Sequence, residues 1–257
     1  MNNSLCSGVD LIMSEVFDLL HSHRSIRKFK AKPVPKDLLI SLISAGQAAA
    51  SSSFLQGVTI IRVTQDDLRN EFKQITGGQS YVEEAPEFLV FCADLSRSMR
   101  CCRMHGSEPA EGLTEHFIIA TVDVALYAQN VAVAAESAGL GICYIGAIRN
   151  DAARSAKLLE LPRQVYPVFG MCIGWPDQEP EVKPRLPISV MLKKNSYSID
   201  GEADAIASYD EEIRNYYATR SANIKIQGWS EQMAGLLSKE SRLHMRPFLE
   251  GKGFLKR

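Results

Sequence analysis

The chain has 257 residues, of which 46% are hydrophobic and 23% charged, a composition typical of folded globular proteins and unlike disordered, collagen-like or coiled-coil sequences. Its 29 basic and 30 acidic residues leave a net charge of -1, which provides no general attraction to nucleic acid or to an anionic membrane. The six cysteines have neither the density nor the spacing of a disulfide framework or a zinc site, which indicates reduced thiols and a cytoplasmic protein.

Residues 1–8 are predicted to form a flexible tail, and an amphipathic helix is expected over residues 9–20. Helical periodicity and short apolar runs then alternate along the chain. The predicted strands are 57–64, 88–92, 142–145 and 165–173, and the further predicted helices are 38–43, 66–76, 117–140, 151–159, 203–220 and 230–237. Residues 96–111 are expected to form a surface excursion.

The segment 117–140 is one of the longest apolar stretches of the chain, but it carries Asp123, Gln129, Asn130 and Glu136. These side chains are costly in a bilayer and tolerable in a buried helix with a polar edge, so the pattern favours a core helix over a membrane span. The N-terminus lacks the basic region of a signal peptide.

The core is predicted to end at Trp175-Pro176, where a proline-rich stretch, 177–187, favours an extended arm. The absence of a flexible linker indicates a single domain over residues 9–257, with 176–257 as a C-terminal extension. Alternating strands and helices on their own suggest a parallel, doubly wound sheet, although the pattern does not determine strand direction.

Motifs of common enzyme classes are missing. Gly139 and Gly141 do not form a dinucleotide fingerprint, because Tyr144 occupies the place of its third glycine and the segment follows a helix. Cys101-Cys102 with His105 has no second ligand pair at suitable spacing, so no metal site is predicted. Nor does any sequence context indicate a catalytic cysteine.

Two basic clusters stand out. Residues 23–27 combine an imidazole, two guanidiniums and a hydroxyl at a helix-to-loop junction, donors that suit an anion such as phosphate. Lys183-Pro184-Arg185 places two cations in the rigid arm. Each cluster alone is weak evidence, because a short basic run is more often a solvated surface patch.

Taken together, segments along almost the whole chain resemble the FMN-dependent nitroreductase family, in particular its oxygen-insensitive NADPH nitroreductases and NADPH-flavin oxidoreductases. The matching blocks, in chain order, are HRSIRKF (23–29), SSSFLQ (51–56), TGGQ (76–79), FCAD (91–94), AESAGLG (135–141), YIGAIRN (144–150), FGMCIGWP (169–176), KPRLP (183–187) and KESR (239–242). The resemblance implies an α+β fold with a mostly antiparallel central sheet wrapped by helices, which replaces the doubly wound expectation. It also implies a homodimer, with FMN at each end of the interface and the C-terminal extension embracing the partner subunit.

The resemblance also assigns roles to individual residues. The FMN-binding positions are His23, Arg24, Ser25, Ile26, Arg27, Ser51, Gln79, Tyr144, Ile145, Gly146, Ala147, Lys183, Pro184 and Arg185. The NADPH-binding positions are Arg220 and Lys225, the latter in place of an arginine. The substrate-binding positions are Phe54 and an arginine, either Arg242 through the KESR match or Arg246 through the RPF that follows it.

The function implied by the resemblance is hydride transfer from NADPH to FMN, followed by two-electron reduction of a nitroaromatic or quinone in a ping-pong sequence. No side chain is expected to be catalytic, because the chemistry belongs to the flavin. Two alternatives remain: a NADPH-flavin oxidoreductase that supplies reduced flavin, and an FMN-binding module without turnover.

Overall fold

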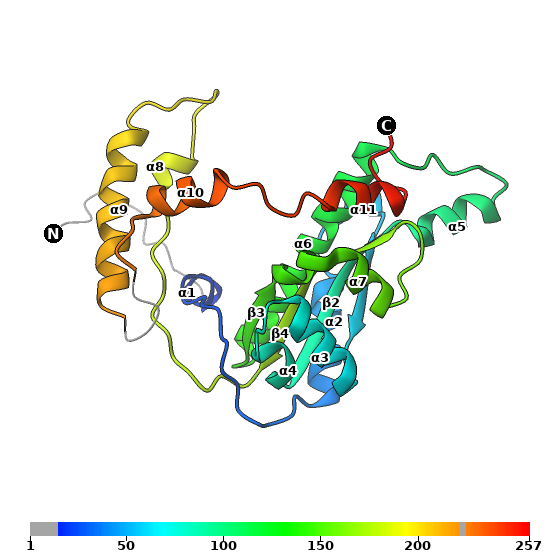
Figure 1. Cartoon of the computed structure of the whole chain (residues 1–257), viewed down its shortest axis with the longest axis horizontal. Coiled ribbons are helices and arrows are strands. Elements are labelled where there is room, and N and C mark those ends of the chain that lie inside the picture. Colours follow the sequence, from blue (N-terminus) through cyan, green and yellow to red (C-terminus); the bar gives the residue numbers. More distant parts are fainter. Residues whose placement is uncertain (1–14, 221–224) are drawn as a thin grey trace. The chain divides into compact units, whose positions relative to one another are not determined.

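The computed structural model describes residues 15–220 and 225–257 and divides the chain into two compact units (Figure 1). The first unit is Met1–Glu179 with Met245–Arg257, and the second is Pro180–His244. The predicted tail, 1–8, and the start of the first predicted helix lie outside the described residues.

The centre of the first unit is a four-stranded sheet with the order β1-β2-β4-β3. Its strands are β1 (Val58–Arg62), β2 (Glu87–Asp94), β3 (Gly141–Ile145) and β4 (Val165–Gly174). Every neighbouring pair is antiparallel, which confirms the antiparallel sheet and shows that the doubly wound expectation from the alternating pattern was wrong. Arg62 pairs with Leu89, so the helical connection between β1 and β2 leaves and re-enters the sheet at the same end.

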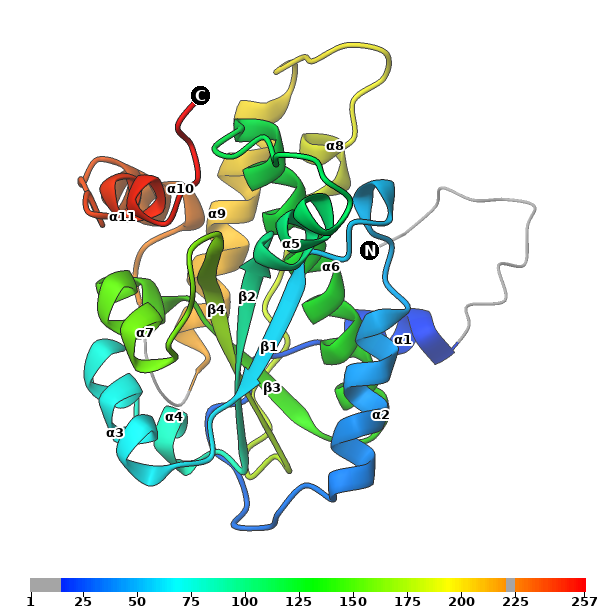
Figure 2. The ribbon, with the colours of Figure 1, turned by 90° about the vertical axis from the view of Figure 1, so that its right-hand side faces the viewer.

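Helices cover both faces of this sheet (Figure 2). On one face lie α2 (Lys36–Gln47) and α6 (Thr114–Ser137), and on the other α3 (Asp66–Ile75) and α7 (Ala152–Leu158). Along β2 the odd-numbered Leu89, Phe91 and Ala93 join the first core, while the even-numbered Phe88, Val90 and Cys92 join the second. Because successive strand residues point to opposite faces, a strand covered on both sides is apolar throughout.

Helix α6 fills the position predicted for a core helix. It is long and apolar enough to cross a membrane by length and composition, a test that core helices of soluble proteins also pass. One side of it packs against α2 and the sheet through residues such as Val124, Ala128 and Val131. Its other side leaves Ile118, Val122 and Leu126 exposed.

Three α-helices in the first unit were missed by the sequence patterns, the shortest of them α4 (Tyr81–Glu84). The expected surface excursion, 96–111, begins with α5 (Ser96–Met104), which buries Met99. The core also does not end at Trp175-Pro176, because the C-terminus returns to it: Leu249 of α11 (Met245–Gly251) and Phe254, which follows this helix, both belong to the core. A seven-residue helix with a proline in its first turn shows too little periodicity to be detected.

The remaining elements are short or belong to the second unit. In the first unit they are α1 (Glu15–His21), α4 (Tyr81–Glu84) and the 3₁₀ turns η1 (Ser52–Phe54) and η2 (Gly146–Asp151). The second unit contains α8 (Ile188–Met191), α9 (Glu202–Ala218) and α10 (Trp229–Leu237), packed around Tyr209, Ile213 and Tyr217. Residues 177–187 form neither helix nor strand, as predicted for the arm.

Candidate functional site

The segment 23–27 is attached to the sheet by its centre. The Ile26 N–H donates to the Ile142 carbonyl at 2.8 Å, and the Ile26 side chain is buried. A Cβ on Gly141 would lie 2.4 Å from the Ile26 side chain, so this close approach requires glycine there. Ile26 is therefore the anchor that holds the neighbouring polar side chains near β3.

His23 is oriented by Glu136 of α6, whose Oε1 lies 2.6 Å from His23 Nδ1. An imidazole held through Nδ1 presents Nε2 as its other hydrogen-bonding atom. Burial raises the pKa of Tyr144 well above its usual range, and the Glu136 carboxylate raises it further. Glu136 thus lies close to both the segment 23–27 and the predicted flavin segment 144–147.

Arg24 lines a pocket of about 520 Å³ together with Ile26, Lys30 and Glu136. Its guanidinium lies 3.4 Å from Glu179, while Ser25 beside it is half-buried. The pocket places two cations beside the end of α6, although acidic groups share the lining.

Arg27 extends toward α4, where its guanidinium hydrogen-bonds to Tyr81. Burial raises the pKa of that phenol, and the positive charge of Arg27 opposes the shift. Two residues earlier, the side-chain Oε1 of Gln79 is buried and has no hydrogen-bond partner among the described residues. An unpaired buried acceptor costs about 1–3 kcal/mol, so this atom suits a ligand that brings an N–H or O–H donor.

Residues 144–147 leave the end of β3 and enter η2. The Tyr144 ring packs edge-to-face on Phe169 at 5.1 Å, whereas Ile145 is buried in the core, so any contact of Ile145 with a ligand would come from its backbone. A Cβ on Gly146 would lie 3.2 Å from Arg149 Nη2, while Ala147 is half-buried. Tyr144, Gly146, Arg149 and Phe169 line a pocket of about 380 Å³.

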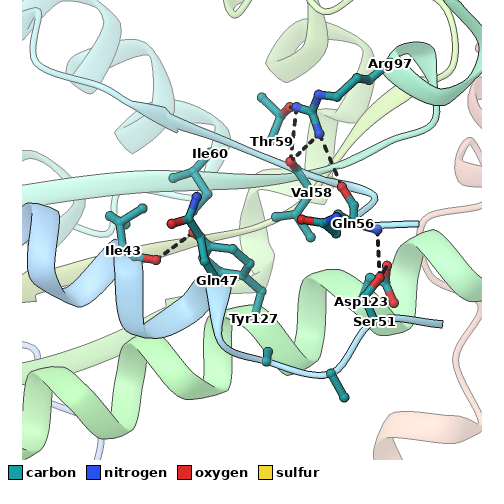
Figure 3. A pocket seen from close by; sticks show the side chains of 12 residues that line it. Ile43, Gln47, Ser51, Gln56, Val58, Thr59, Ile60, Arg97, Asp123 and Tyr127 are labelled. Carbon is teal, nitrogen blue, oxygen red and sulfur yellow. Dashed lines mark hydrogen bonds between the residues drawn. The ribbon is translucent and has the colours of Figure 1, made fainter. Parts of the chain in front are cut away.

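Ser51 lies in a second place on the same unit, beside a pocket of about 420 Å³ (Figure 3). Its hydroxyl donates to Asp123 Oδ2 at 2.6 Å and accepts from the Gln56 N–H at 2.7 Å. The loop between Ser51 and Gln56 exposes 80% of Phe54. Across the pocket, Arg97 donates to the Gln56 carbonyl at 3.2 Å (Figure 3).

The two places are well separated within one chain. Ser51 is bonded to Asp123, and His23 pairs with Glu136. Both acidic residues belong to α6, and a helix rises 1.5 Å per residue, so they lie about 20 Å apart along its axis. The structure therefore brings His23, Arg24, Ile26, Arg27 and residues 144–147 to one region and Ser51 with Phe54 to another.

In the second unit, three of the predicted cations gather around Tyr217. Lys183 Nζ donates to the Tyr217 hydroxyl at 3.0 Å. Lys225 Nζ lies 5.3 Å and the Arg220 guanidinium 5.8 Å from the centre of its ring. Burial alone would raise the pKa of Tyr217, but the Lys183 hydrogen bond and the three positive charges outweigh it and lower the pKa below its ordinary value.

The other predicted residues of the arm and C-terminus are also placed. Pro184 accepts a hydrogen bond from the Tyr209 hydroxyl at 2.9 Å, and Arg185 donates to the Lys183 carbonyl at 3.2 Å. Arg242 belongs to the second unit and Arg246 to α11 of the first, where it pairs with Glu250. Both arginines remain predictions for the substrate side.

Sequence reasoning gave no role to Asp123, Glu136, Arg149 or Tyr217. Asp123 bonds to Ser51, Glu136 to His23 and Tyr217 to Lys183, in each case across a long separation in the chain. Arg149 lies beside Gly146, three residues earlier in the chain. For Asp123 and Glu136 the available signal was their placement inside an apolar helix, because buried carboxylates need hydrogen-bond partners.

An antiparallel sheet between two helical layers, with cations and small residues placed along one edge strand, β3, defines the class to which the chain belongs. Residues 20–175 match the model described as "Nitroreductase family", and residues 183–257 match the model described as "Nitroreductase family, C-terminal domain". The protein belongs to the nitroreductase family.

Individual relatives narrow the comparison. The chain is 46% identical over 245 residues to the NADPH-flavin oxidoreductase of Vibrio harveyi, covering 95% of this chain and 100% of that protein. It is 41% identical to the oxygen-insensitive NADPH nitroreductase of Salmonella typhimurium, with the same coverage of 95% and 100%. The solved structure of NADPH:FMN oxidoreductase from Vibrio harveyi complexed with NAD+ matches with a TM-score of 0.86 and 45% identity, over 94% of this chain and 99% of that one.

Proposed function

We propose that this protein is an FMN-dependent oxidoreductase that uses NADPH to reduce nitroaromatics and quinones by electron pairs, in a ping-pong sequence. Family membership supports this, as do relatives named NADPH-flavin oxidoreductase and oxygen-insensitive NADPH nitroreductase. Bound FMN would supply reversible acceptance of a hydride, which no side chain provides. The residues of the chain bind and orient the flavin and its two substrates.

The observation that carries the cofactor assignment is a set of donors and acceptors from the segment 23–27, from Gln79 and from the residues that follow β3. His23, Arg24 and Arg27 suit the phosphate or the electron-rich edge of a flavin, because charged donors form the stronger hydrogen bonds to anions. The buried Gln79 Oε1 needs a donor, which flavin N–H or ribityl hydroxyl groups offer. Gly146 has no side chain to keep a planar ring from the backbone. These residues fit FMN.

The separation between the two groups of predicted flavin contacts supports a homodimer as part of the proposal. If Ser51 and His23 serve one flavin, they belong to different subunits, since α6 holds them far apart in one chain. Exposed apolar side chains provide a surface for such a dimer. They are Val16, Phe17 and Leu20 on α1 and Ile118, Val122 and Leu126 on α6. The single domain with an extension that embraces the partner is part of this proposal.

The NADPH phosphate would bind at the cations around Tyr217, with Arg220 and Lys225 as its ligands. The oxidised acceptor would then take the place of NADPH near Phe54 and one of the two C-terminal arginines. The exposure of Phe54 supports a contact with a bulky aromatic substrate.

A cytoplasmic location is also part of the proposal. Cys92, Cys101, Cys102, Cys143 and Cys172 are all free thiols in the described part of the chain. Free thiols persist in the reducing cytoplasm, where FMN and NADPH are also at hand.

A second candidate function is that of a NADPH-flavin oxidoreductase, which releases reduced flavin to a partner. Its support is the 46% identity to the Vibrio harveyi protein of that name. The two functions differ in the preferred acceptor, so steady-state competition between free FMN and a nitroaromatic separates them. The acceptor with the higher kcat/KM defines the activity.

The test of the main proposal is anaerobic stopped-flow absorbance of the purified protein. Yellow protein should be bleached by NADPH faster than by NADH, and then reoxidised by a nitroaromatic. Bound flavin that NADPH does not bleach would indicate an FMN module without turnover. Protein that neither contains nor takes up FMN would overturn the proposal.

A further inference from the structure

Asp123 is a buried carboxylate without an assigned role. It lies in the middle of α6 with 2% of its surface exposed. It accepts three hydrogen bonds from one loop: from the Ser51 hydroxyl at 2.6 Å, the Ser52 N–H at 3.0 Å and the Gly57 N–H at 3.2 Å. Both ends of the loop 51–57 are therefore attached to one side chain.

The backbone between these two ends is held in an unfavourable conformation. Ser53, Phe54 and Gln56 have φ values of 50°, 56° and 52°, in the left-handed region that non-glycine residues seldom adopt. Such a conformation persists only when surrounding bonds enforce it. The clamp formed by Asp123 supplies these bonds, and it keeps Phe54 directed outward.

The same contacts determine the direction of the hydrogen bonds at Ser51. A serine hydroxyl has one proton to donate and two lone pairs that accept. The proton is donated to Asp123, and one lone pair accepts the Gln56 N–H (Figure 3). What remains for a ligand is the second lone pair, so Ser51 can meet a donor but cannot donate to a phosphate or carbonyl oxygen.

We propose that Asp123 is a positioning residue that fixes Ser51 as a hydrogen-bond acceptor, so that the Ser51 hydroxyl receives a proton donor of FMN, either the ring N–H or a ribityl hydroxyl. The inference rests on the proposed function, because FMN is the ligand. It adds two points to that function: Ser51 accepts a hydrogen bond from the flavin, and Asp123 imposes this direction. Asp123 itself does not touch the cofactor.

The first test replaces the carboxylate by its isosteric amide. In Asp123→Asn an N–H group must face one of the three donors, so the Ser51 proton turns outward or a backbone N–H loses its acceptor. The dissociation constant for FMN, measured by flavin fluorescence, should rise about tenfold, as expected for one lost hydrogen bond. Hydrogen exchange at the Ser52 and Gly57 amides of the apoprotein should accelerate.

A double-mutant cycle then separates positioning from general destabilisation. If Asp123 acts through Ser51, Ser51→Ala and Asp123→Asn each lower the affinity for FMN. The double variant then has about the same affinity for FMN as the single variant that binds it less tightly. The control is Glu87→Gln. Glu87 is likewise buried, with 3% exposed, and pairs with Arg62 at 2.6 Å on the sheet. Loss of the Glu87 charge in this variant should lower the Tm of the protein without changing its affinity for FMN.

A third measurement uses flavin analogues and needs no change at Asp123. N3-methylated FMN lacks the ring N–H, and ribityl-deoxy FMN lacks a hydroxyl donor. Wild-type protein should bind one of these analogues about tenfold more weakly than FMN, and Ser51→Ala should bind that analogue and FMN equally.

The outcomes separate this inference from the function on which it rests. Wild-type protein that binds no FMN overturns the proposed function. Wild-type protein that binds FMN, while Ser51→Ala responds to both analogues as the wild type does, overturns only the role of Ser51 and Asp123. An additive double-mutant cycle does the same.

Discussion

At the scale of single residues, ionisation of the Tyr217 phenol changes the net charge of the cationic cluster that surrounds it. Its hydroxyl accepts from Lys183, and Arg220 and Lys225 lie near its ring. These charges lower the pKa of Tyr217 from the usual value near 10, so the phenol ionises earlier than an isolated tyrosine as the pH rises. The phenolate then adds a negative charge at the place proposed for the NADPH phosphate.

This leads to a prediction on pH dependence. Between about pH 8 and pH 10, the KM of the wild type for NADPH should rise about threefold more than that of Tyr217→Phe, an effect typical of one partly screened charge. NADH lacks the 2′-phosphate and should show a smaller difference. Steady-state kinetics across this range checks it, and parallel NADPH profiles for the two proteins would contradict it.

The cysteines give a second prediction for individual residues. Burial raises the pKa of Cys92 to about 12, whereas Cys101 on α5 is exposed. Since the thiolate is the reactive form, Cys101 should react with a maleimide at about pH 8 and Cys92 only after unfolding. Peptide mass spectrometry over time would show the order. Equal labelling rates in native protein would mean that β2 is not buried as described.

Single residues were predicted from sequence only as far as their own chemistry indicates a function. The cations of 23–27 and of the arm were singled out as candidates because charged donors in a cluster suggest an anion. Asp123, Glu136 and Tyr217 were not detected, because their effect depends on contacts with residues distant in the chain, such as the one between Asp123 and Ser51. No local pattern specifies which buried carboxylate meets which loop.

Two helical glycines show how packing can reverse a local preference at the scale of elements. A Cβ added to Gly235 in α10 would have no atom within 4 Å, whereas a Cβ on Gly46 in α2 would lie 2.2 Å from Tyr127 of α6. Gly235→Ala should raise the free energy of unfolding by up to about 1 kcal/mol through helix propensity. Gly46→Ala should lower it by about 1–3 kcal/mol, because α2 and α6 must separate.

Urea unfolding of the two variants and the wild type gives the free energy of unfolding of each protein. The same Gly→Ala substitution is thereby compared at two positions. A gain of stability at Gly46 would show that α2 does not pack tightly on α6. A loss at Gly235 would show that the exposed face of α10 is covered in the folded protein.

Elements were predictable where their periodicity is strong. The four strands and the helices α3, α6, α7 and α9 were all expected near their observed positions. Strand direction was not, because an alternating pattern is the same whether a connection crosses the sheet or returns to the same end. The family resemblance supplied the antiparallel direction that the pattern lacked. Helix α11 escaped notice because it is short and its partners lie far back in the chain.

For the whole molecule, the central question is whether two copies are needed to bind one flavin. Helix α6 carries Asp123 and Glu136 about 20 Å apart, and a second subunit that supplied either Ser51 or His23 would let one flavin contact both without spanning this distance. On either side of Asp123 in the sequence, α6 exposes Val122 and Leu126, at 48% and 43%. A dimer that buries this face would bring the two groups of contacts together.

The expected result of charging this face is loss of the dimer and of flavin together. Val122→Arg with Leu126→Arg should weaken dimerisation about a hundredfold, because two unpaired charges would be buried at the centre of an apolar interface. The control is Met104→Arg on α5, another exposed apolar residue at 79%, on a helix that carries no predicted flavin contact. Sedimentation velocity reports the oligomer, and the visible absorbance of the flavin reports bound cofactor. A monomeric variant with full flavin content would show that one chain binds FMN alone, and Ser51 would then have no place in the cofactor site.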